Sequence, residues 1–131
     1  MSELKTPILV VVTGEGGSGG ALAISVGDHL SMLEYATYSV ASPEACASII
    51  WRSADEAEKA AESMKVSASE LKKINIIDEI IQEPLGGAHR NYDLTSEIIK
   101  KSLIKNLSSL QKLSNEKLIE RRYQRLLKIG K

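Results

Sequence analysis

The residues with the clearest chemical potential form a glycine-rich run, Gly14-Glu-Gly-Gly-Ser-Gly-Gly20, in which five of the seven residues are glycine. The run follows a β-branched segment and precedes an apolar one, so we expect it to join a strand to a helix. The first N–H groups of a helix have no intrahelical acceptor, and the helix dipole favours negative charge there. Gly19 and Gly20 can therefore form an oxyanion hole with their main-chain N–H groups.

Two phosphate-binding motifs, the dinucleotide fingerprint and the P-loop, fit the glycine run less well than an oxyanion hole does. Gly14 to Gly19 matches G-x-G-x-x-G, but a dinucleotide fold also needs a strand that ends in an acidic residue about 20 positions on. Glu34 has this spacing but precedes its expected strand, and Glu15 would place a carboxylate beside the pyrophosphate. The P-loop pattern fails because no Gly-Lys-Ser/Thr follows. Close packing of helix on strand explains one or two glycines more easily than five.

Few other side chains suggest catalysis. The sequence shows no Ser-His-Asp order in a nucleophile context, no His pair at i and i+4 and no Cys-His set. His29 lies in an apolar segment and is expected to be a packing or surface residue. His89 and Arg90, which follow a Gly-Gly pair, are candidates for contact with a substrate or a partner. Cys46, the only cysteine, is expected to be a small buried residue, and it excludes an internal disulfide.

Composition indicates one soluble α/β domain. The chain has one Trp, four Tyr and no Phe, so its core must use Ile, Leu, Val and Ala. No run approaches the roughly 20 apolar residues of a membrane span, and residues 1–5 lack the plan of a signal peptide. Metal binding by this chain is not expected. We therefore expect a soluble intracellular protein.

Periodicity and capping signals predict an alternation of strands and helices. Pro7–Thr13 is a continuous β-branched run, typical of a strand buried on both faces, and it should have neighbouring strands on either side. Ser42-Pro predicts a helix start, and Ser53 and Ser67 begin capping-box patterns. The remaining expected elements are a buried helix over 21–33, strands over 35–40 and 76–81, a loop over 83–91, and helices from Leu94 and Ser114 that form a hairpin or paired tail.

Charge is unevenly distributed along the chain. Residues 100–131 hold ten Lys and Arg against two Asp and Glu, whereas residues 1–99 hold seven against fifteen. We expect a body over 1–92 and a basic helical tail over 93–131. Within the tail, Arg121, Arg122 and Arg125 can make bidentate pairs with carboxylates, so we expect them to contact a partner subunit. Nucleic-acid binding is not expected, because Tyr123 is the only aromatic residue among these basic ones.

Five blocks of sequence, in order, resemble the carboxyltransferase alpha-subunit family of bacterial and plastid acetyl-CoA carboxylases. They begin at the glycine run and end at an arginine-rich segment, and they cover nearly the whole chain. One small departure is Ala45, where the family usually has Gly. The larger departure is length, because the family's subunit is more than twice as long; we expect a C-terminal fragment. The blocks are Gly14-Glu-Gly-Gly-Ser-Gly-Gly-Ala-Leu22, Tyr38-Ser-Val with Ser42-Pro-Glu, Cys46-Ala-Ser-Ile with Trp51, Glu83-Pro-Leu-Gly-Gly-Ala-His-Arg90 and Arg121-Arg-Tyr-Gln-Arg-Leu126.

The resemblance implies a fold, a reaction and partners. The fold would be a crotonase-like (ClpP/crotonase) β-β-α superhelix, here a fragment with a C-terminal helical tail. The reaction would transfer the carboxyl group of carboxybiotin, held on a biotin carboxyl carrier protein, to acetyl-CoA, giving malonyl-CoA for fatty-acid synthesis. A beta subunit and a further alpha subunit would be partners, in a bacterial cytoplasm or a plastid stroma. Gly19 and Gly20 would hold the biotin ureido oxygen. Gly16, Gly17 and Ser18 would line the substrate site together with His89 and Arg90.

Two other functions remain open at this point. A stand-alone crotonase-like acyl-CoA hydratase or isomerase would need an acidic pair near the glycine loop, and Glu15 and Glu34 are the nearby candidates. A non-catalytic interaction module would bind its partners through the basic tail.

The isolated chain, without its partner subunits, is expected to lack carboxyltransferase activity and to expose apolar surface around Pro7–Val12.

Overall fold

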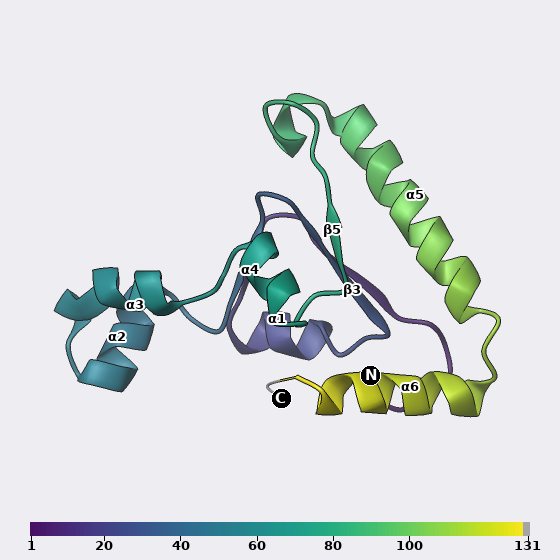
Figure 1. Ribbon diagram of the computed structural model, residues 1–131, viewed down its shortest axis with the longest axis horizontal. Helices are drawn as coiled ribbons and strands as arrows, with labels where there is room; N and C mark the ends of the chain where they lie inside the picture. The colour runs from purple at the N-terminus through teal and green to yellow at the C-terminus, as the bar shows by residue number, and fades with distance from the viewer. Residues whose placement is uncertain (130–131) are drawn as a thin grey trace.

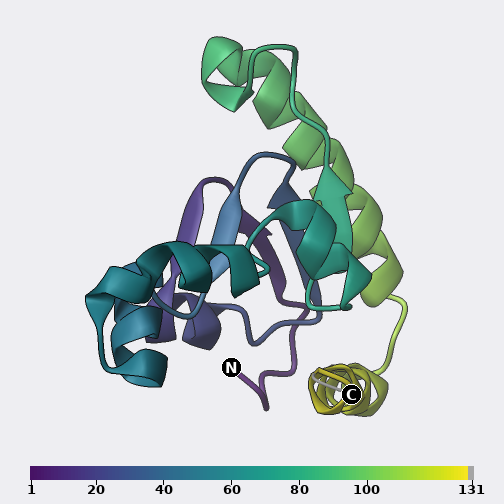
Figure 2. The ribbon, with the colours of Figure 1, turned by 60° about the vertical axis from the view of Figure 1, so that its left-hand side comes forward.

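Two small parallel sheets form the centre of the molecule in the computed structural model, which describes residues 1–129 (Figures 1 and 2). The first sheet has the order β1-β3-β5 and the second β2-β4, and every pair of these strands is parallel. The chain enters the second sheet directly from the first, from β1 into β2 and from β3 into β4. The strands are β1 (Leu9–Val12), β2 (Glu15–Gly17), β3 (His29–Leu33), β4 (Thr37–Ser39) and β5 (Glu79–Ile81).

Helices follow each pair of strands. The order β1-β2-α1 is a β-β-α unit, and β3-β4 leads through three further helices into β5. This mixed α/β architecture with parallel sheets confirms the expected fold class at that level. The helical elements are α1 (Ser18–Ile24), α2 (Pro43–Trp51), η1 (Ala54–Glu56), α3 (Ala57–Ser63), α4 (Ala68–Lys73), η2 (Ala88–Arg90), α5 (Tyr92–Leu110) and α6 (Asn115–Leu127).

The expected capping residues begin their helices. The side chain of Ser42 accepts a hydrogen bond from the N–H of Ala45 at the start of α2, with Pro43 as the first helical residue. Ser67 and Ser114 accept in the same way at the starts of α4 and α6. Ser53 caps a single 3-10 turn, which then continues as α3. The three predicted caps, Ser42, Ser53 and Ser67, are thus confirmed, and Ser114 caps the helix that was expected to start there.

The prediction of one buried helix over 21–33 is wrong. The helix ends at Ile24, and His29–Leu33 is β3, the central strand of the first sheet. The Ser25 hydroxyl donates to the Ala21 carbonyl at 2.6 Å at the end of α1. Gly27 then passes so close to the start of β1 that a Cβ there would lie 3.0 Å from the Ile8 carbonyl oxygen. The Gly27-Asp28 pair is a turn signal that ends the helix despite the apolar residues on both sides.

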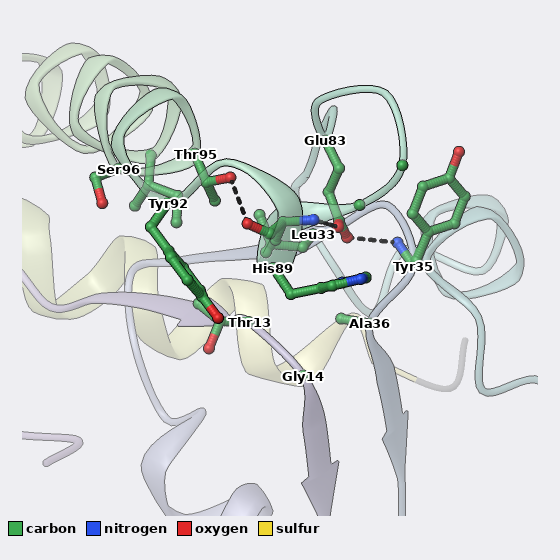
Figure 3. A pocket seen from close by; sticks show the side chains of 14 residues that line it. Thr13, Gly14, Leu33, Tyr35, Ala36, Glu83, His89, Tyr92, Thr95 and Ser96 are labelled. Carbon is green, nitrogen blue, oxygen red and sulfur yellow. Dashed lines mark hydrogen bonds between the residues drawn. The ribbon is translucent and has the colours of Figure 1, made fainter.

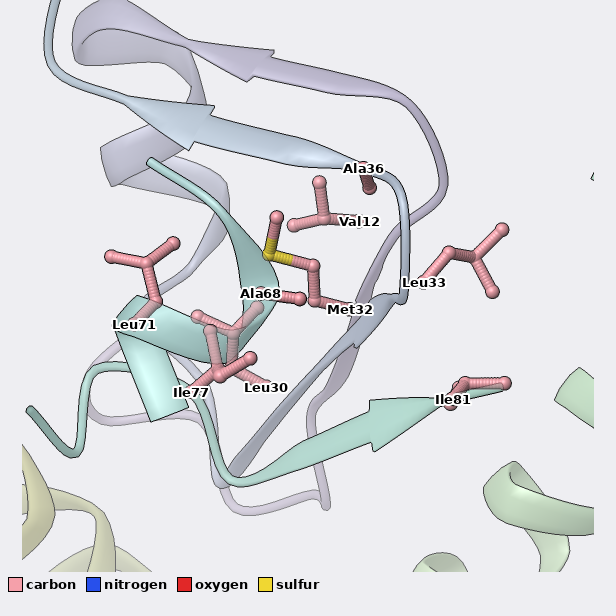
Figure 4. Close-up of a cluster of buried hydrophobic side chains, with 9 residues drawn as sticks. All are labelled: Val12, Leu30, Met32, Leu33, Ala36, Ala68, Leu71, Ile77 and Ile81. Carbon is pink, nitrogen blue, oxygen red and sulfur yellow. The ribbon is translucent and has the colours of Figure 1, made fainter. Parts of the chain in front are cut away.

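Apolar residues on both faces of β3 form the core (Figure 4). Leu30 and Met32 point to one face, toward Leu71 of α4 and Ile77. Leu33 lies on the other face, beside Ile81 of β5. The partly buried Ile98 and Ile99 of α5 also pack against this core. A strand covered on both faces is typical of parallel sheets, and here the face that carries Leu33 also buries the polar Ser31.

Helices α2 and α3 pack against each other away from the sheets, at the left of Figure 1. Their small core consists of Cys46, Ala47 and Ala60. Cys46 is buried as expected. The Lys59 ammonium lies 4.7 Å from the centroid of the Trp51 ring, a cation–π contact across the pair. Residues as small as alanine allow the two helix backbones to approach closely.

Helix α6 crosses the amino ends of the strands instead of pairing with α5, so the expected hairpin is wrong (Figure 1). Its arginines bond to carboxylates that precede two strands. Arg122 Nη2 lies 2.8 Å from Asp28 Oδ2, and Arg125 Nε lies 2.9 Å from Asp78 Oδ2. Each of these carboxylates also accepts from a main-chain N–H, of Ile8 and of Leu30 respectively. Helix α6 is therefore bonded to the first sheet at the amino ends of its strands.

The three arginines were expected to contact a partner, and the structure places them differently. Arg122 and Asp28 are both 0% exposed, so Arg122 cannot reach a partner. Its guanidinium also donates to carbonyl oxygens of the first six residues, at 2.9 to 3.0 Å. Arg121 donates to the Asp28 carbonyl at 2.6 Å, and the Arg125 side chain is 13% exposed in its pair with Asp78. The physical reason is that the fully buried Asp28 carboxylate needs a cation within the chain, and the partly exposed Asp78 pairs with Arg125 at the same end of the sheet.

Glu79 of β5 anchors α5 to the sheet through a polar cluster. Its Oε2 accepts from Ser102 at 2.7 Å and from Asn106 at 2.8 Å, and it lies 3.3 Å from His29 Nε2. His29 is thus a packing residue with a polar partner, as expected. Burial acts to raise the pKa of Glu79, but the hydrogen bonds from Ser102, Asn106 and His29 outweigh it, so the pKa lies below 4.5.

We expect stability to depend on pH through Glu79. Because its pKa is lowered in the folded state, its ionised form stabilises the fold above the unfolded pKa of about 4.3. This contribution is lost as the pH falls through the lower, folded pKa. Unfolding by urea, measured from pH 7 to pH 3, should show a wild-type advantage over Glu79→Gln that shrinks in the acid range. A constant difference across that range would contradict this account of Glu79.

Candidate functional site

The glycine loop occupies the corner where β1 passes into β2 and then into α1. Helix α1 begins at Ser18, so Gly19 and Gly20 lie in its first turn, as the sequence predicted. Their N–H groups belong to the set that has no intrahelical acceptor. Ser18 itself has φ +62°, in the left-handed region, which is rare for a residue with a side chain. This conformation turns the chain from the direction of β2 into that of α1.

The loop glycines fall into two classes. A Cβ on Gly16 would lie 2.8 Å from the Tyr38 ring, so glycine is required there by packing within the chain. A Cβ on Gly14, Gly17, Gly19 or Gly20 would meet no other atom within 4 Å. Neither Gly19 nor Gly20 has a positive φ, so backbone conformation does not require glycine either. Nothing within the described part of the chain demands glycine at Gly19 and Gly20.

Tyr38 of β4 packs against the glycine loop, a role that was not predicted from the sequence. Its ring lies against Gly16, and its hydroxyl donates to the Ser25 hydroxyl at 3.0 Å. Ser25 in turn donates to the Ala21 carbonyl at the end of α1. Tyr38 therefore contacts the unit that contains Gly19 and Gly20 at both its ends. The parallel pairing of β2 with β4 brings Gly16 opposite Tyr38, and no short-range pattern in the sequence reveals this register.

An apolar groove of about 560 Å³ begins beside the loop. Ser18, Gly19 and Leu22 form one wall, and residues of β4, α4 and the end of α6 form the others. Arg125 and Lys65 are its charged lining residues. Binding sites for small molecules commonly combine an apolar lining with a few polar groups. The groove therefore gives an apolar ligand access to the first turn of α1.

A second pocket, of about 790 Å³, lies at the carboxyl ends of the strands of the first sheet (Figure 3). His89 and Tyr92 line it together with Gly14, the first residue of the glycine loop. Figure 3 shows the Tyr92 hydroxyl near Thr13 and the His89 ring directed toward Ala36 and Tyr35. The carboxyl edge of a parallel sheet is a common location for ligands. His89 is thus brought to a pocket, but not to the groove that contains Gly19.

Glu83 holds the loop that carries His89. One carboxylate oxygen accepts from the Tyr35 N–H at 3.0 Å, and the other accepts from the Ala88 N–H at 2.6 Å. The turn also uses Gly86 and Gly87, with φ +89° and +95°, where glycine is the residue best suited to the backbone. Arg90 does not line the pocket; its side chain lies over Gly86, 3.2 Å from where a Cβ would be. The carboxylate preceding a Gly-Gly pair was the available sequence signal for Glu83.

Metal ligands and membrane-spanning helices are two further features to consider in the described residues. Within residues 1–129, no group of three or more His, Cys, Asp and Glu side chains is placed to hold a metal ion. The helices described here include none that is long and apolar enough to cross a membrane.

Comparison with known proteins gives a consistent family. The model of a family described as acetyl co-enzyme A carboxylase carboxyltransferase-like matches residues 1–130. The relatives include proteins named acetyl-coenzyme A carboxylase carboxyl transferase subunit alpha from Alcanivorax borkumensis and Vibrio cholerae, each 58% identical, and from Histophilus somni, 59% identical. Each match covers 99% of this chain but only 40% or 41% of the relative. The chain, whose glycine loop and Gly-Gly-Ala-His-Arg turn lie inside the matched region, belongs to the acetyl co-enzyme A carboxylase carboxyltransferase-like family.

Proposed function

We propose that this chain supplies part of the carboxyltransferase active site of a biotin-dependent acetyl-CoA carboxylase. The observation that carries the proposal is the open space at Gly19 and Gly20 in a chain of this family. No described residue requires glycine at these positions, and a molecule that approaches their backbone would account for it. The fold would be part of a crotonase-like β-β-α superhelix, which the β1-β2-α1 unit and the parallel sheets support.

The role of this chain is to stabilise charge by main-chain donors. When bound, carboxybiotin would supply carbon dioxide by cleavage of its N–C bond, and its ureido nitrogen would take a proton from the acetyl methyl group. The enolate carbon so formed would bond to the carbon dioxide, which leaves biotin and malonyl-CoA as products. The N–H groups of Gly19 and Gly20 hold the ureido oxygen as negative charge develops on it, each donor being worth about 2.7–4 kcal/mol. Ser18 and Gly17 set the direction of these donors, and Tyr38 holds the loop against β4. No side-chain nucleophile is needed.

The remaining expected residues have supporting roles in this proposal. Gly16 allows the loop to pack on Tyr38, and the apolar groove beside Gly19 admits the aliphatic part of the biotin group. His89 contacts acetyl-CoA or the beta subunit from the pocket at the carboxyl edge, while Arg90 packs over Gly86 and shapes the turn. The biotin group arrives on its carrier protein, and the beta subunit and a further alpha subunit complete the assembly.

A chimera tests the proposal. The matched region of the Vibrio cholerae relative is replaced by residues 1–130 of this chain, and the chimera is assembled with that organism's beta subunit and biotinylated carrier protein. Because the two regions are 58% identical, we expect malonyl-CoA formation within about tenfold of the unmodified subunit. An assembled chimera that forms no malonyl-CoA, while the unmodified subunit is active in the same assay, would contradict the proposal.

A further inference from the structure

Helix α1, which carries Gly19 and Gly20, is held weakly by side-chain packing. Within the described part of the chain, none of its seven residues is buried, and Leu22 and Ile24 are 66% and 63% exposed. In proteins most of the stability of a helix comes from packing of an apolar face against the fold, and α1 has little of it. Within this chain, contacts other than apolar packing must therefore fix where the first turn of α1 points.

The opposite end of α1 is fixed by two consecutive hydrogen bonds. Ser25, the residue after the helix, is only 9% exposed, and its hydroxyl donates to the Ala21 carbonyl at 2.6 Å. The same hydroxyl accepts a hydrogen bond from the Tyr38 hydroxyl at 3.0 Å. The first bond lies within the turn that ends the helix, whereas the second joins that turn to β4. We call the hydrogen bond between Tyr38 and Ser25 the α1 anchor.

Tyr38 is a rigid support for this bond. Its main-chain N–H donates to the Val66 carbonyl at 3.0 Å, and its strand β4 pairs with β2. Its ring lies so close to Gly16 of β2 that a Cβ there would be 2.8 Å away. Because both the backbone and the ring are held, the position of the hydroxyl is set by the second sheet. The α1 anchor therefore ties the end of α1 to the sheet β2-β4.

The distance between the α1 anchor and the donors makes the direction of the helix important. Gly19 lies six residues before Ser25, which corresponds to about 9 Å along a helix axis. A tilt of about 6° at the anchored end would therefore displace the N–H groups of Gly19 and Gly20 by about 1 Å. A misplacement of about 1 Å at a catalytic group can lower the rate by about 10²-fold. A hydrogen bond at one end of α1 can thus control chemistry at the other.

We propose that Tyr38 and Ser25 are positioning residues for carboxyl transfer. Their hydrogen bond sets the direction of α1, so that the N–H groups of Gly19 and Gly20 meet the ureido oxygen as it gains negative charge. This role rests on the proposed function, because it requires that these two N–H groups act as the donors. The hydroxyls of Tyr38 and Ser25 bond each other instead of the ligand, so they act on kcat and not on substrate binding.

Tyr38→Phe removes the α1 anchor and little else. A phenylalanine ring fills the same space against Gly16, and the main-chain bond to Val66 does not involve the side chain. The Ser25 hydroxyl keeps its bond to the Ala21 carbonyl. The lost contact is the link between the end of α1 and β4. Ser25→Ala removes the same link from the other side.

The test uses the Vibrio cholerae chimera, assembled with that organism's beta subunit and biotinylated carrier protein. We expect Tyr38→Phe to lower kcat for malonyl-CoA formation at least about tenfold, with KM for acetyl-CoA and for the carrier protein within about twofold of the unsubstituted chimera. Ser25→Ala should give a similar loss. The double variant should lose no more than the larger single loss, because both changes break one bond. Light scattering verifies that each variant assembles normally before kcat is compared.

Tyr123→Phe and Ser48→Ala are the matched controls. Tyr123 of α6 is 56% exposed and lines neither the groove nor the pocket beside the glycine loop. Ser48 donates to the carbonyl four residues earlier in α2, at 2.9 Å. Ser48→Ala therefore removes the same kind of local bond as Ser25→Ala, without a link to a strand. Both controls should keep the kcat of the unsubstituted chimera.

Three results would each overturn the proposal: unchanged kcat in either Tyr38→Phe or Ser25→Ala, a raised KM with unchanged kcat, or additive losses in the double variant. Gly20→Val in the same chimera separates these results from failure of the proposed function. If Gly20→Val lowers kcat and Tyr38→Phe does not, the donors act but the α1 anchor does not position them. If Gly20→Val also leaves kcat unchanged, the oxyanion role itself is wrong.

Discussion

Replacing Arg122 with Met is expected to lower the free energy of unfolding by about 3–5 kcal/mol, the range for breaking a buried ion pair from one side. The cause is that Asp28, which is 0% exposed, would keep its carboxylate but lose the cation that bonds both of its oxygens. The guanidinium also bonds the carbonyl oxygens of Met1, Ser2, Leu4 and Thr6. Met matches much of the volume of Arg, so the loss reports the polar contacts.

Urea denaturation of the 131-residue chain measures this effect. Lys117→Met is the matched control, because Lys117 is an exposed residue of the same helix, and its replacement should change stability by no more than about 0.5 kcal/mol. The double variant Asp28→Asn and Arg122→Met should lose less than the sum of the two single losses, since no unpaired charge remains. A single-variant loss as small as that of Lys117→Met would show that α6 does not hold the sheet through this pair.

Sequence reasoning succeeded where local chemistry decides the structure. The β-branched run at Pro7–Thr13 contains β1, and Ser42 and Ser67 cap the helices that they were expected to cap. The glycine loop lies between a strand and a helix, with Gly19 and Gly20 in the first turn. In each case the signal lies within a few residues of the feature that it predicts.

The failures concern contacts between distant segments. Arg122 meets Asp28 across 94 residues, and Glu79 meets His29 across 50, so neither partner can be identified from spacing. The basic tail was therefore predicted to be a partner surface, although Arg122 and Arg125 pair with Asp28 and Asp78 of this chain. The expected helix over 21–33 failed because apolar periodicity alone cannot distinguish a buried helix from a buried parallel strand.

The sequence identifies the loop glycines, but it does not show why glycine is needed at each position. Only the fold shows that Gly16 lies against Tyr38, while Gly20 faces open space. Gly16→Ala should therefore destabilise the chain, because the new methyl group would lie 2.8 Å from the ring. Gly20 occupies a helical position where a side chain meets nothing, so its replacement should leave the free energy of unfolding nearly unchanged.

Gly20→Val has the opposite expected profile in catalysis. A branched side chain beside the donor would shield its N–H group from the ureido oxygen, and loss of one such donor typically reduces kcat by about 10²–10³-fold. The chain itself should fold as before, because no atom of the described residues lies within 4 Å of the new Cβ. Gly20→Val should therefore lower activity without lowering stability, whereas Gly16→Ala should lower both.

The decisive measurement is kcat for malonyl-CoA formation by the Vibrio cholerae chimera carrying Gly20→Val, made beside the unfolding free energy of the 131-residue chain with the same substitution. The account predicts a loss of about 10²-fold or more in kcat, with a stability change below about 0.5 kcal/mol and normal subunit assembly. Wild-type kcat in the assembled Gly20→Val chimera would contradict it, because the donors of the glycine loop would then have no part in carboxyl transfer.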